Sequence, residues 1–501
     1  MKNVLAKIFL KKPGQWWFWV LLALVVKGAI LIFQFAHADH GTYNGLIGSV
    51  GGDTHLYLEP VDNLINYGSY DPDYRMPGYG AFYFFLRFCF APVAALNLLI
   101  LLQYLLAALS VYMLALIGGK VFKSQAMFYF TYYLFLISTY SNLEDGSLLS
   151  ESLCVSFLVF TVYFAVQWAE NYKNTNLLLS GLFLTEVIFL KPVYAPLLLL
   201  FVLFAIITSW KAHRPAFLKY ALIFMLPFIL IDGAWLVRNY NVHKRILPLT
   251  TLTFLRGYDT RLFWAAMDFM QTWGGNYVSW DPASEMRYFN IRERLTSFHK
   301  ENMRDTYKQL PAEIYTSAFN ADSLIVLKNL VAEIQADSNP VTANQHIDYV
   351  DAKFEAYALS VKKENPFVYY VKAPLRYVKI FLIHPGTYNL FPKAASQLSK
   401  PELLVKIFYS LFYIMALLLG GVGLLLLVKK SLSFGTVALV TGVLAYTVVI
   451  YPLVLRMCEP RYFMPAWPFL LLCMAYALYC AWKKLVNKNN DYAFSSATDI
   501  Q

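Results

Sequence analysis

Residues 51–80 read GGDTHLYLEPVDNLINYGSYDPDYRMPGYG and follow the first long apolar segment of the chain. The run 53–66 has the apolar spacing of an amphipathic helix. Pro60 lies inside this run and predicts a kink or a division into two short helices. A carboxylate and a guanidinium on such a segment, Asp53 and Arg75, indicate a site for a phosphorylated lipid at a membrane surface. Taken alone, the stretch would be better explained as an ordinary surface helix and loop.

The rest of the chain is strongly apolar. Of its 501 residues, 58% are hydrophobic and only 15% are charged. Soluble domains carry about 25% charged residues. Several apolar runs reach the roughly 20 residues that are needed to cross a bilayer. The sequence therefore predicts an all-α polytopic membrane protein.

The basic residues cluster at the ends of the apolar segments, although the net charge of +11 could also indicate a nucleic-acid partner. The positive-inside rule explains this clustering, and no basic helix has the interleaved aromatic residues typical of nucleic-acid binding. We therefore expect membrane lipids, and no nucleic acid, as partners. The first apolar segment is too long for a typical signal peptide and predicts an uncleaved signal anchor, which places the loop after it outside the cytoplasm.

Apolar runs and their basic flanks predict about ten transmembrane helices. They cover residues 16–36, 92–118, 126–139, 148–168, 177–190, 193–210, 221–237, 403–428, 433–454 and 462–482. The chain is expected to be a multi-pass protein of an inner (plasma) membrane. Its functional face is expected to point to the periplasm or the outside.

Four parts follow from this topology. Residues 1–240 are expected to form an N-terminal membrane domain, whose first external loop, 37–90, carries the candidate functional residues Asp53 and Arg75. Residues 241–365 are rich in charged and polar side chains and predict a small external soluble domain, although a solvated loop suits them equally. Residues 366–392 are apolar but interrupted by charges and prolines, which favours a helix lying in the interface. Residues 393–501 form a C-terminal membrane domain with a short cytoplasmic tail.

Ionisable residues gather on the predicted outer face, whereas the cytoplasmic loops carry little besides lysine. Such groups are costly at a membrane and are usually functional. A transporter would instead have charges near the midplane and broken helices in its two halves. The outer residues are Asp53, His55, Arg75, Glu144, Asp145, Lys191, Arg238, His384, Glu459 and Arg461.

A series of motifs resembles glycosyltransferase family 39, whose members use polyprenyl-phosphate sugars. The first loop supplies an Asp after the first span, a Tyr four residues later and the Arg-Met-Pro-Gly-Tyr turn at 75–79. Further similar segments follow in order: Leu-Ser-Glu-Ser-Leu at 149–153, Trp-Leu-Val-Arg-Asn-Tyr at 235–240, residues 358–369 and Glu-Pro-Arg-Tyr-Phe-Met-Pro at 459–465. The resemblance implies a GT-C fold and an inverting glycosyltransferase of the cell envelope. The enzyme would move a hexosyl or pentosyl group from polyprenyl phosphate to a lipid, glycan or protein.

The chain departs from the family pattern in ways that leave sugar and acceptor open. Gly80 stands where many relatives have proline, and the soluble part lies at 241–365 instead of at the C-terminus. Thr54 follows Asp53, where eukaryotic mannosyltransferases have an Asp-Glu pair. The acceptor is therefore not assigned.

Transfer from a lipid phosphate needs a base for the attacking hydroxyl and cations for the departing phosphate. Asp53 is the candidate base, with a helix cap or a structural carboxylate as the alternative. Substrate and phosphate contacts are assigned to residues of the family-like motifs and to one further lysine. These are Arg75, Tyr57, Lys191, Arg238, Arg461 and Tyr462. The alternative for each cation is a side chain that reaches toward lipid headgroups.

Asp145 is a candidate second catalytic carboxylate that would orient the acceptor or, with Asp53, bind a divalent cation. Glu144 is its alternative, and an ordinary loop acid suits both positions. Glu151 begins an apolar run, so its carboxylate requires a partner there. His55 and His384 lack the spacing of metal ligands. No metal site is assigned and no cofactor is required, although a divalent cation stays open; His55, Glu144 and Glu151 are supporting candidates.

Two other functions compete with a transferase of this kind. A transporter or flippase for lipid-linked saccharides is disfavoured by the charge distribution and by the lack of evident repeated halves. A polymerase or ligase would take a diphosphate-linked oligosaccharide, and its key arginines usually lie in a large late loop.

Overall fold

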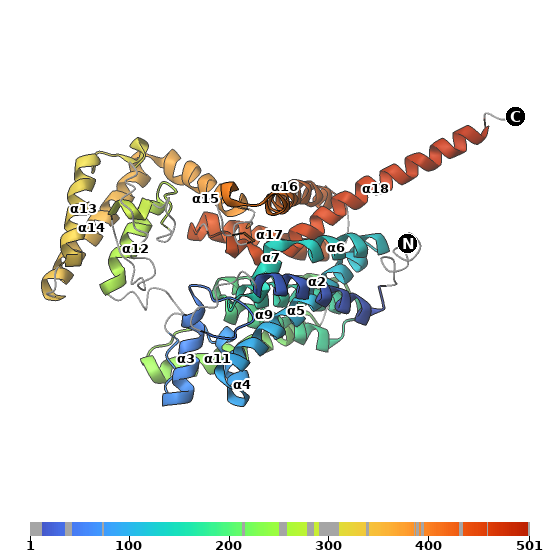
Figure 1. Ribbon diagram of the computed structural model, residues 1–501, viewed down its shortest axis with the longest axis horizontal. Coiled ribbons are helices and arrows are strands. Elements are labelled where there is room, and N and C mark those ends of the chain that lie inside the picture. The colour runs from blue at the N-terminus through green and yellow to red at the C-terminus, as the bar shows by residue number, and fades with distance from the viewer. Residues whose placement is uncertain are drawn as a thin grey trace. The chain divides into compact units, whose positions relative to one another are not determined.

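The protein is helical in the parts described by the computed structural model (Figure 1). Those parts are residues 13–35, 43–72, 75–212, 216–249, 258–277, 285–289, 310–336, 340–384, 386, 390–391, 395–429, 434–457 and 459–498. Within them the backbone forms helices and two isolated bridges, without a strand element. The predicted all-α class is confirmed.

Eight helices of the described part are long and apolar enough to cross a membrane. Five lie in α2 (Trp16–Phe35), α5 (Pro92–Val121), α8 (Glu151–Asn171), α11 (Phe217–His243) and α16 (Lys400–Lys429). The other three include an adjoining helical turn: Pro192–Trp210 with α10 (Leu197–Ala212), Val437–Leu455 with α17 (Phe434–Val449) and Pro460–Leu485 with α18 (Trp467–Thr498). Two shorter apolar helices, α6 (Gln125–Ile137) and α9 (Asn174–Leu190), occupy the other two predicted crossings. The prediction of a polytopic membrane protein is confirmed.

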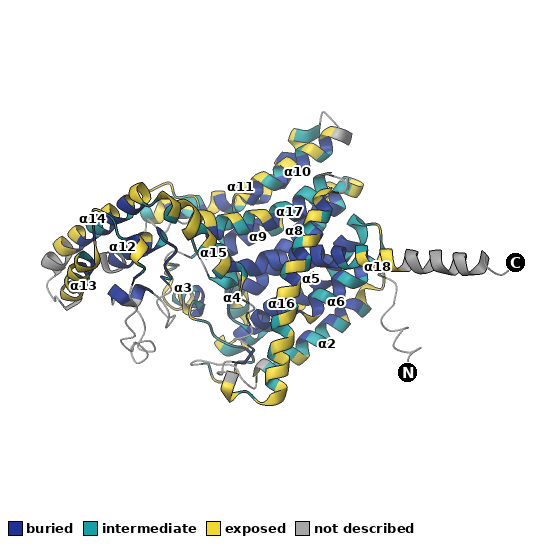
Figure 2. Cartoon of the chain, turned by 90° about the horizontal axis from the view of Figure 1, so that it is seen from above, coloured by how far each residue is buried: buried dark blue, intermediate teal, exposed yellow. Residues whose placement is uncertain are grey.

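The chain divides into two compact units. Unit 1 comprises Met1–Thr250, Pro385–Thr447 and Arg461–Gln501, and unit 2 comprises Thr251–His384 and Val448–Pro460. In unit 1, α8 packs against α5 and α9, α9 packs against α11, and α16 packs against α18. Figure 2 shows α5 and α8 buried along most of their length, whereas α16 exposes much of its surface. Since the exposed residues of α16 are largely apolar, its outer face suits contact with lipid.

Two short helices form the first loop of unit 1, α3 (Thr54–Tyr67) and α4 (Gly78–Cys89). The helix α3 is continuous although it contains Pro60, so of the two predicted effects the division into two short helices is wrong and the kink stays a prediction. Proline removes one backbone hydrogen bond, and the burial of Leu58 and Val61 on the same helix offsets that loss. The helix α3 ends at Gly68, which has a φ of 69°.

Unit 2 has an apolar core of its own, built around Phe269, Phe354 and Tyr377. Its helices are α12 (Tyr258–Gln271), α13 (Ala321–Ala336), α14 (Pro340–Glu364) and α15 (Ala373–Leu382), with a π-helical turn at Val368–Lys372. Two of these helices, α13 and α14, lie within the part predicted as soluble, 241–365. This core favours a folded domain over a solvated loop. A loop that buries no apolar area would lose conformational entropy on folding without compensation.

The predicted domain limits can be compared with these units. The limit predicted at 240 falls inside α11, which continues to His243. The described residues 366–384 of the predicted interfacial segment belong to unit 2, where Tyr377 and Phe381 are buried and Leu375 is exposed. Contact of this segment with a membrane interface stays a prediction.

Candidate functional site

The first loop is fixed by backbone contacts to the turn before α8. The Ser49 N–H donates a hydrogen bond to the Gly146 carbonyl at 2.9 Å, and the Leu148 N–H donates to the Ser49 carbonyl at 2.9 Å. A Cβ atom at Gly48 would lie 2.1 Å from the Gly146 carbonyl oxygen, so only glycine permits this approach. The pairing places the start of α3 beside the start of α8.

Thr54, the first residue of α3, ties the start of the helix to the turn before it and to the segment before α8. Its hydroxyl donates to the Leu148 carbonyl at 2.9 Å and accepts from the Gly51 N–H at 2.8 Å. Asp53 occupies the N-cap position but makes no side-chain capping bond. The helix-cap alternative for Asp53 is therefore wrong, because its carboxylate is directed to other partners.

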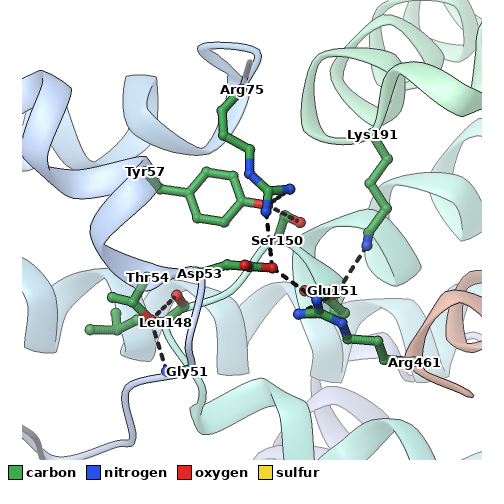
Figure 3. A network of polar contacts seen from close by, with 10 residues as sticks. All are labelled: Gly51, Asp53, Thr54, Tyr57, Arg75, Leu148, Ser150, Glu151, Lys191 and Arg461. Carbon is green, nitrogen blue, oxygen red and sulfur yellow. Dashed lines mark hydrogen bonds and ion pairs between the residues drawn. The ribbon is translucent and has the colours of Figure 1, made fainter. Parts of the chain in front are cut away.

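Those partners form an ion-pair cluster of five side chains, Asp53, Arg75, Glu151, Lys191 and Arg461, which we call the site cluster (Figure 3). The Oδ2 atom of Asp53 lies 3.0 Å from a nitrogen of Arg75 and 2.9 Å from a nitrogen of Arg461. Glu151 Oε1 lies 2.9 Å from Lys191 Nζ and 3.8 Å from Arg461. Three cations therefore surround two carboxylates, which leaves one formal positive charge.

Two tyrosines adjoin the site cluster, and their predicted contacts with a substrate stay predictions. The guanidinium of Arg75 lies 5.1 Å from the ring centre of Tyr57 and donates to its hydroxyl at 3.3 Å. The same hydroxyl is 3.2 Å from the Ser150 hydroxyl. The ring of Tyr462 lies 4.9 Å from Lys191 Nζ. Both rings hold cations by their faces, which limits how far those cations can move.

The site cluster is assembled from five places in unit 1. Asp53 and Arg75 flank α3, Glu151 begins α8, and Lys191 directly follows α9. Arg461 belongs to the 3₁₀ turn Pro460–Ala466 before α18. A Cβ atom at Gly78 would lie 2.6 Å from the backbone of Phe189, so a side chain there would displace the Arg75 loop from the end of α9.

The site cluster has an outer and a deep end. The side chains of Asp53, Arg75 and Arg461 are 23%, 24% and 24% exposed, whereas Glu151 is 2% exposed. Burial by itself would raise the pKa of Asp53, but the charges of Arg75 and Arg461 outweigh it and hold that pKa below its ordinary value of 3.8. Asp53 is therefore ionised at neutral pH.

Asp145 belongs to a different ion pair. Its Oδ2 lies 2.6 Å from the Nζ of Lys27 in α2, and its Oδ1 accepts a hydrogen bond from the Ser152 hydroxyl at 2.6 Å. Burial raises the pKa of Asp145, although the Lys27 charge opposes that effect. Both carboxylate oxygens are thus engaged by partners outside the site cluster, and the catalytic role of Asp145 stays a prediction. A lysine inside an apolar span usually has a charged partner, so Lys27 itself was a signal for this pair.

Glu144 is buried on the turn Leu143–Gly146, next to Asp145 in the chain. Burial and the charge of Glu151 raise the pKa of Glu144 to about 7, while the charge of Arg461 opposes the rise. A carboxyl group that titrates near neutrality can exchange a proton at physiological pH. Glu144 thus keeps its place as a supporting candidate.

The contacts of Arg238 lie outside the site cluster, and His55 is not one of its members. Arg238 lies on α11, where it donates to the Tyr70 carbonyl and stacks on Trp235, whose ring centre is 4.9 Å away. This contact anchors the chain that leads from α3 to Arg75. His55 is exposed on α3. Their predicted roles at the site stay predictions.

The described residues contain no group of three or more His, Cys, Asp or Glu side chains that could hold a metal ion. Asp53 and Asp145, the predicted pair for a divalent cation, are bound to different cationic side chains. These two residues therefore do not fit a shared metal site.

No protein-family model matches the chain, and no curated protein matches it. The class of ligand is therefore inferred from the side chains of the site cluster. Guanidinium groups bind phosphate through paired hydrogen bonds, and a lysine acts as a point charge. Two arginines and a lysine next to two tyrosine rings, at the ends of apolar helices, are suited to an anionic headgroup.

Proposed function

We propose that this chain is an inverting glycosyltransferase with a GT-C fold, belonging with glycosyltransferase family 39. It would move a sugar from polyprenyl phosphate to a hydroxyl group of a lipid, glycan or protein on the outer face of an inner membrane. The observation that supports this most directly is Asp53, which is held between Arg75 and Arg461 beside the Glu151–Lys191 pair. One carboxylate can take a proton while the cations around it receive a phosphate.

The charge of the site cluster suits a single phosphate. A sugar phosphodiester carries one negative charge, which equals the one formal positive charge left over in the cluster. A second negative charge develops on the phosphate as the bond to the sugar breaks. Cations already in place stabilise that charge in the transition state without reorganisation.

In the proposed reaction the acceptor hydroxyl oxygen attacks the anomeric carbon of the sugar. The bond from that carbon to the phosphate oxygen breaks, its electron pair stays on polyprenyl phosphate, and the configuration at the carbon inverts. Asp53 would take the hydroxyl proton on its carboxylate, whose Oδ2 atom lies beside both arginines. Because the arginines lower its pKa, Asp53 is a weak base, so stabilisation of the leaving phosphate has to supply much of the acceleration.

Two competing functions fit the site cluster less well. A transporter or flippase would be expected to have its charged groups near the membrane midplane, whereas Glu151, Lys191 and Arg461 lie at helix ends. A polymerase or ligase would take a diphosphate-linked saccharide. Such a donor carries more negative charge than the cluster has unmatched positive charge.

The transfer itself is tested with isotopically labelled donors. Purified protein, incubated with a membrane extract, should release the sugar from one polyprenyl-phosphate sugar and leave the corresponding diphosphate-linked saccharides intact. The readout is labelled product together with free polyprenyl phosphate. Consumption of the diphosphate-linked form alone would favour the polymerase or ligase, and consumption of neither form would contradict the proposal.

The proposed orientation is tested with reporter fusions. Reporters placed after Asp145, Arg238 or residue 300 should register as external, and reporters after Lys120, Lys211 or Lys430 as cytoplasmic. The expectation follows from the basic flanks of the apolar helices. A cytoplasmic signal at residue 300 would contradict the scheme, because the whole site would then face the wrong side.

A further inference from the structure

One carboxylate oxygen of the site cluster is buried without a hydrogen-bond donor. In the described part of the chain, Glu151 Oε2 is buried and has no hydrogen-bond partner, whereas Oε1 of the same carboxylate lies 2.9 Å from Lys191 Nζ. The Glu151 side chain is 2% exposed. A buried carboxylate oxygen without a donor is strongly unfavourable, so such an atom is expected to receive a hydrogen from a bound molecule.

The position of Glu151 indicates which molecule this is. Arg461 contacts both carboxylates, with Asp53 at the outer end of the site cluster and Glu151 at the deep end. A phosphate held by Arg461 and Lys191 would therefore lie beside Glu151. The group attached to that phosphate in a glycosyl donor is the sugar, and its hydroxyl groups are hydrogen-bond donors. An acceptor entering from outside would meet the more exposed Asp53 first.

We propose that Glu151 Oε2 accepts a hydrogen bond from a hydroxyl group of the donor sugar, and that Glu151 thereby distinguishes glycosylated from bare polyprenyl phosphate. This inference rests on the proposed binding of a polyprenyl-phosphate sugar at the site cluster. Lys191 and Arg461 hold one oxygen of the carboxylate and keep it charged, while the other oxygen is left for the ligand. A hydroxyl group that donates to a carboxylate forms one of the stronger kinds of hydrogen bond.

The test is a binding measurement without any acceptor. Polyprenyl phosphate and a panel of polyprenyl-phosphate pentoses and hexoses are titrated onto purified full-length protein. The wild type should bind at least one glycosylated form more tightly than the bare phosphate. Glu151→Gln should weaken binding of that form by about 10- to 100-fold, as expected for loss of a hydrogen bond to a charged group. Binding of the bare phosphate should not be weakened, because glutamine keeps an oxygen for Lys191 and the cluster loses a negative charge.

Two control variants separate sugar recognition from phosphate binding. Lys191→Met should weaken the binding of both ligands, since it removes a cation. Glu59→Gln changes an exposed carboxylate of α3 outside the site cluster and should weaken neither. If Glu151→Gln fails to fold, Glu151→Asp withdraws the carboxylate by one methylene group and should show the same selective loss.

Two outcomes would overturn the inference while leaving the proposed function standing. Wild-type affinity of Glu151→Gln for both ligands would mean that only water meets Oε2. An equal loss for both ligands would mean that Glu151 merely supports Lys191. Failure of the wild type to bind either ligand would overturn the proposed function itself, and the inference with it.

Discussion

Replacing Asp53 with asparagine should lower sugar transfer by roughly 10²–10⁴-fold, the range for loss of a positioned acid or base. Asparagine keeps the size of the side chain and one oxygen for an arginine, but it cannot take a proton at neutral pH. Because the carboxylate makes no capping bond, α3 should still form. The expected signature is a fall in kcat with little change in the affinity for the donor.

The remaining alternative is that Asp53 only holds Arg75 and Arg461 in place. In that case Asp53→Asn should chiefly lower the affinity for the donor, because both guanidinium groups would lose their ion-pair partner. The value of kcat at saturation should be retained. Asp62→Asn is the matched control, since Asp62 lies on the same helix and is also paired with an arginine, Arg87 at 3.4 Å. An Asp53→Asn enzyme with wild-type kcat would contradict the base assignment and direct the search to Glu144 and Asp145.

Local features of the first loop could be predicted from the sequence. The helix at 53–66 follows from apolar spacing, and its end follows from Gly68, because each depends on neighbours within a few residues. The apolar spans follow from length and composition alone. The behaviour of Pro60 could not be predicted in this way, because the burial of α3 depends on chain segments far away in sequence.

The ion-pair partners of the charged residues could not be predicted from local sequence features. Asp53 meets Arg461 across 408 positions, and Glu151 meets Lys191 across 40. The need of Glu151 for a partner was predicted from its place at the start of an apolar run, but the identity of that partner depends on how α8 and α9 pack. Motif membership grouped Arg238 with the phosphate contacts, whereas α11 directs it to Tyr70 and Trp235.

Arg461 contacts both carboxylates of the site cluster. Its guanidinium lies 2.9 Å from Asp53 and 3.8 Å from Glu151. Arg461→Ala should therefore weaken donor binding by roughly 10²–10³-fold, as expected when one partner of a partly buried charge pair is truncated. Use of the acceptor should change much less, because the lost partner is the phosphate. Arg461→Lys should restore part of the loss, since a point charge cannot reproduce the paired hydrogen bonds.

The same substitution should change the pH dependence of transfer. Arg461 is one of the charges that hold the pKa of Asp53 below 3.8 against the effect of burial, so its removal should raise that pKa. Transfer requires ionised Asp53, and in Arg461→Ala it should therefore be lost at a higher pH than in the wild type as the solution is acidified. Arg87→Ala removes an arginine paired with Asp62 and should leave the profile unchanged. A wild-type donor KM and a wild-type acid limb in Arg461→Ala would remove Arg461 from the site, because both effects depend on its charge lying beside Asp53.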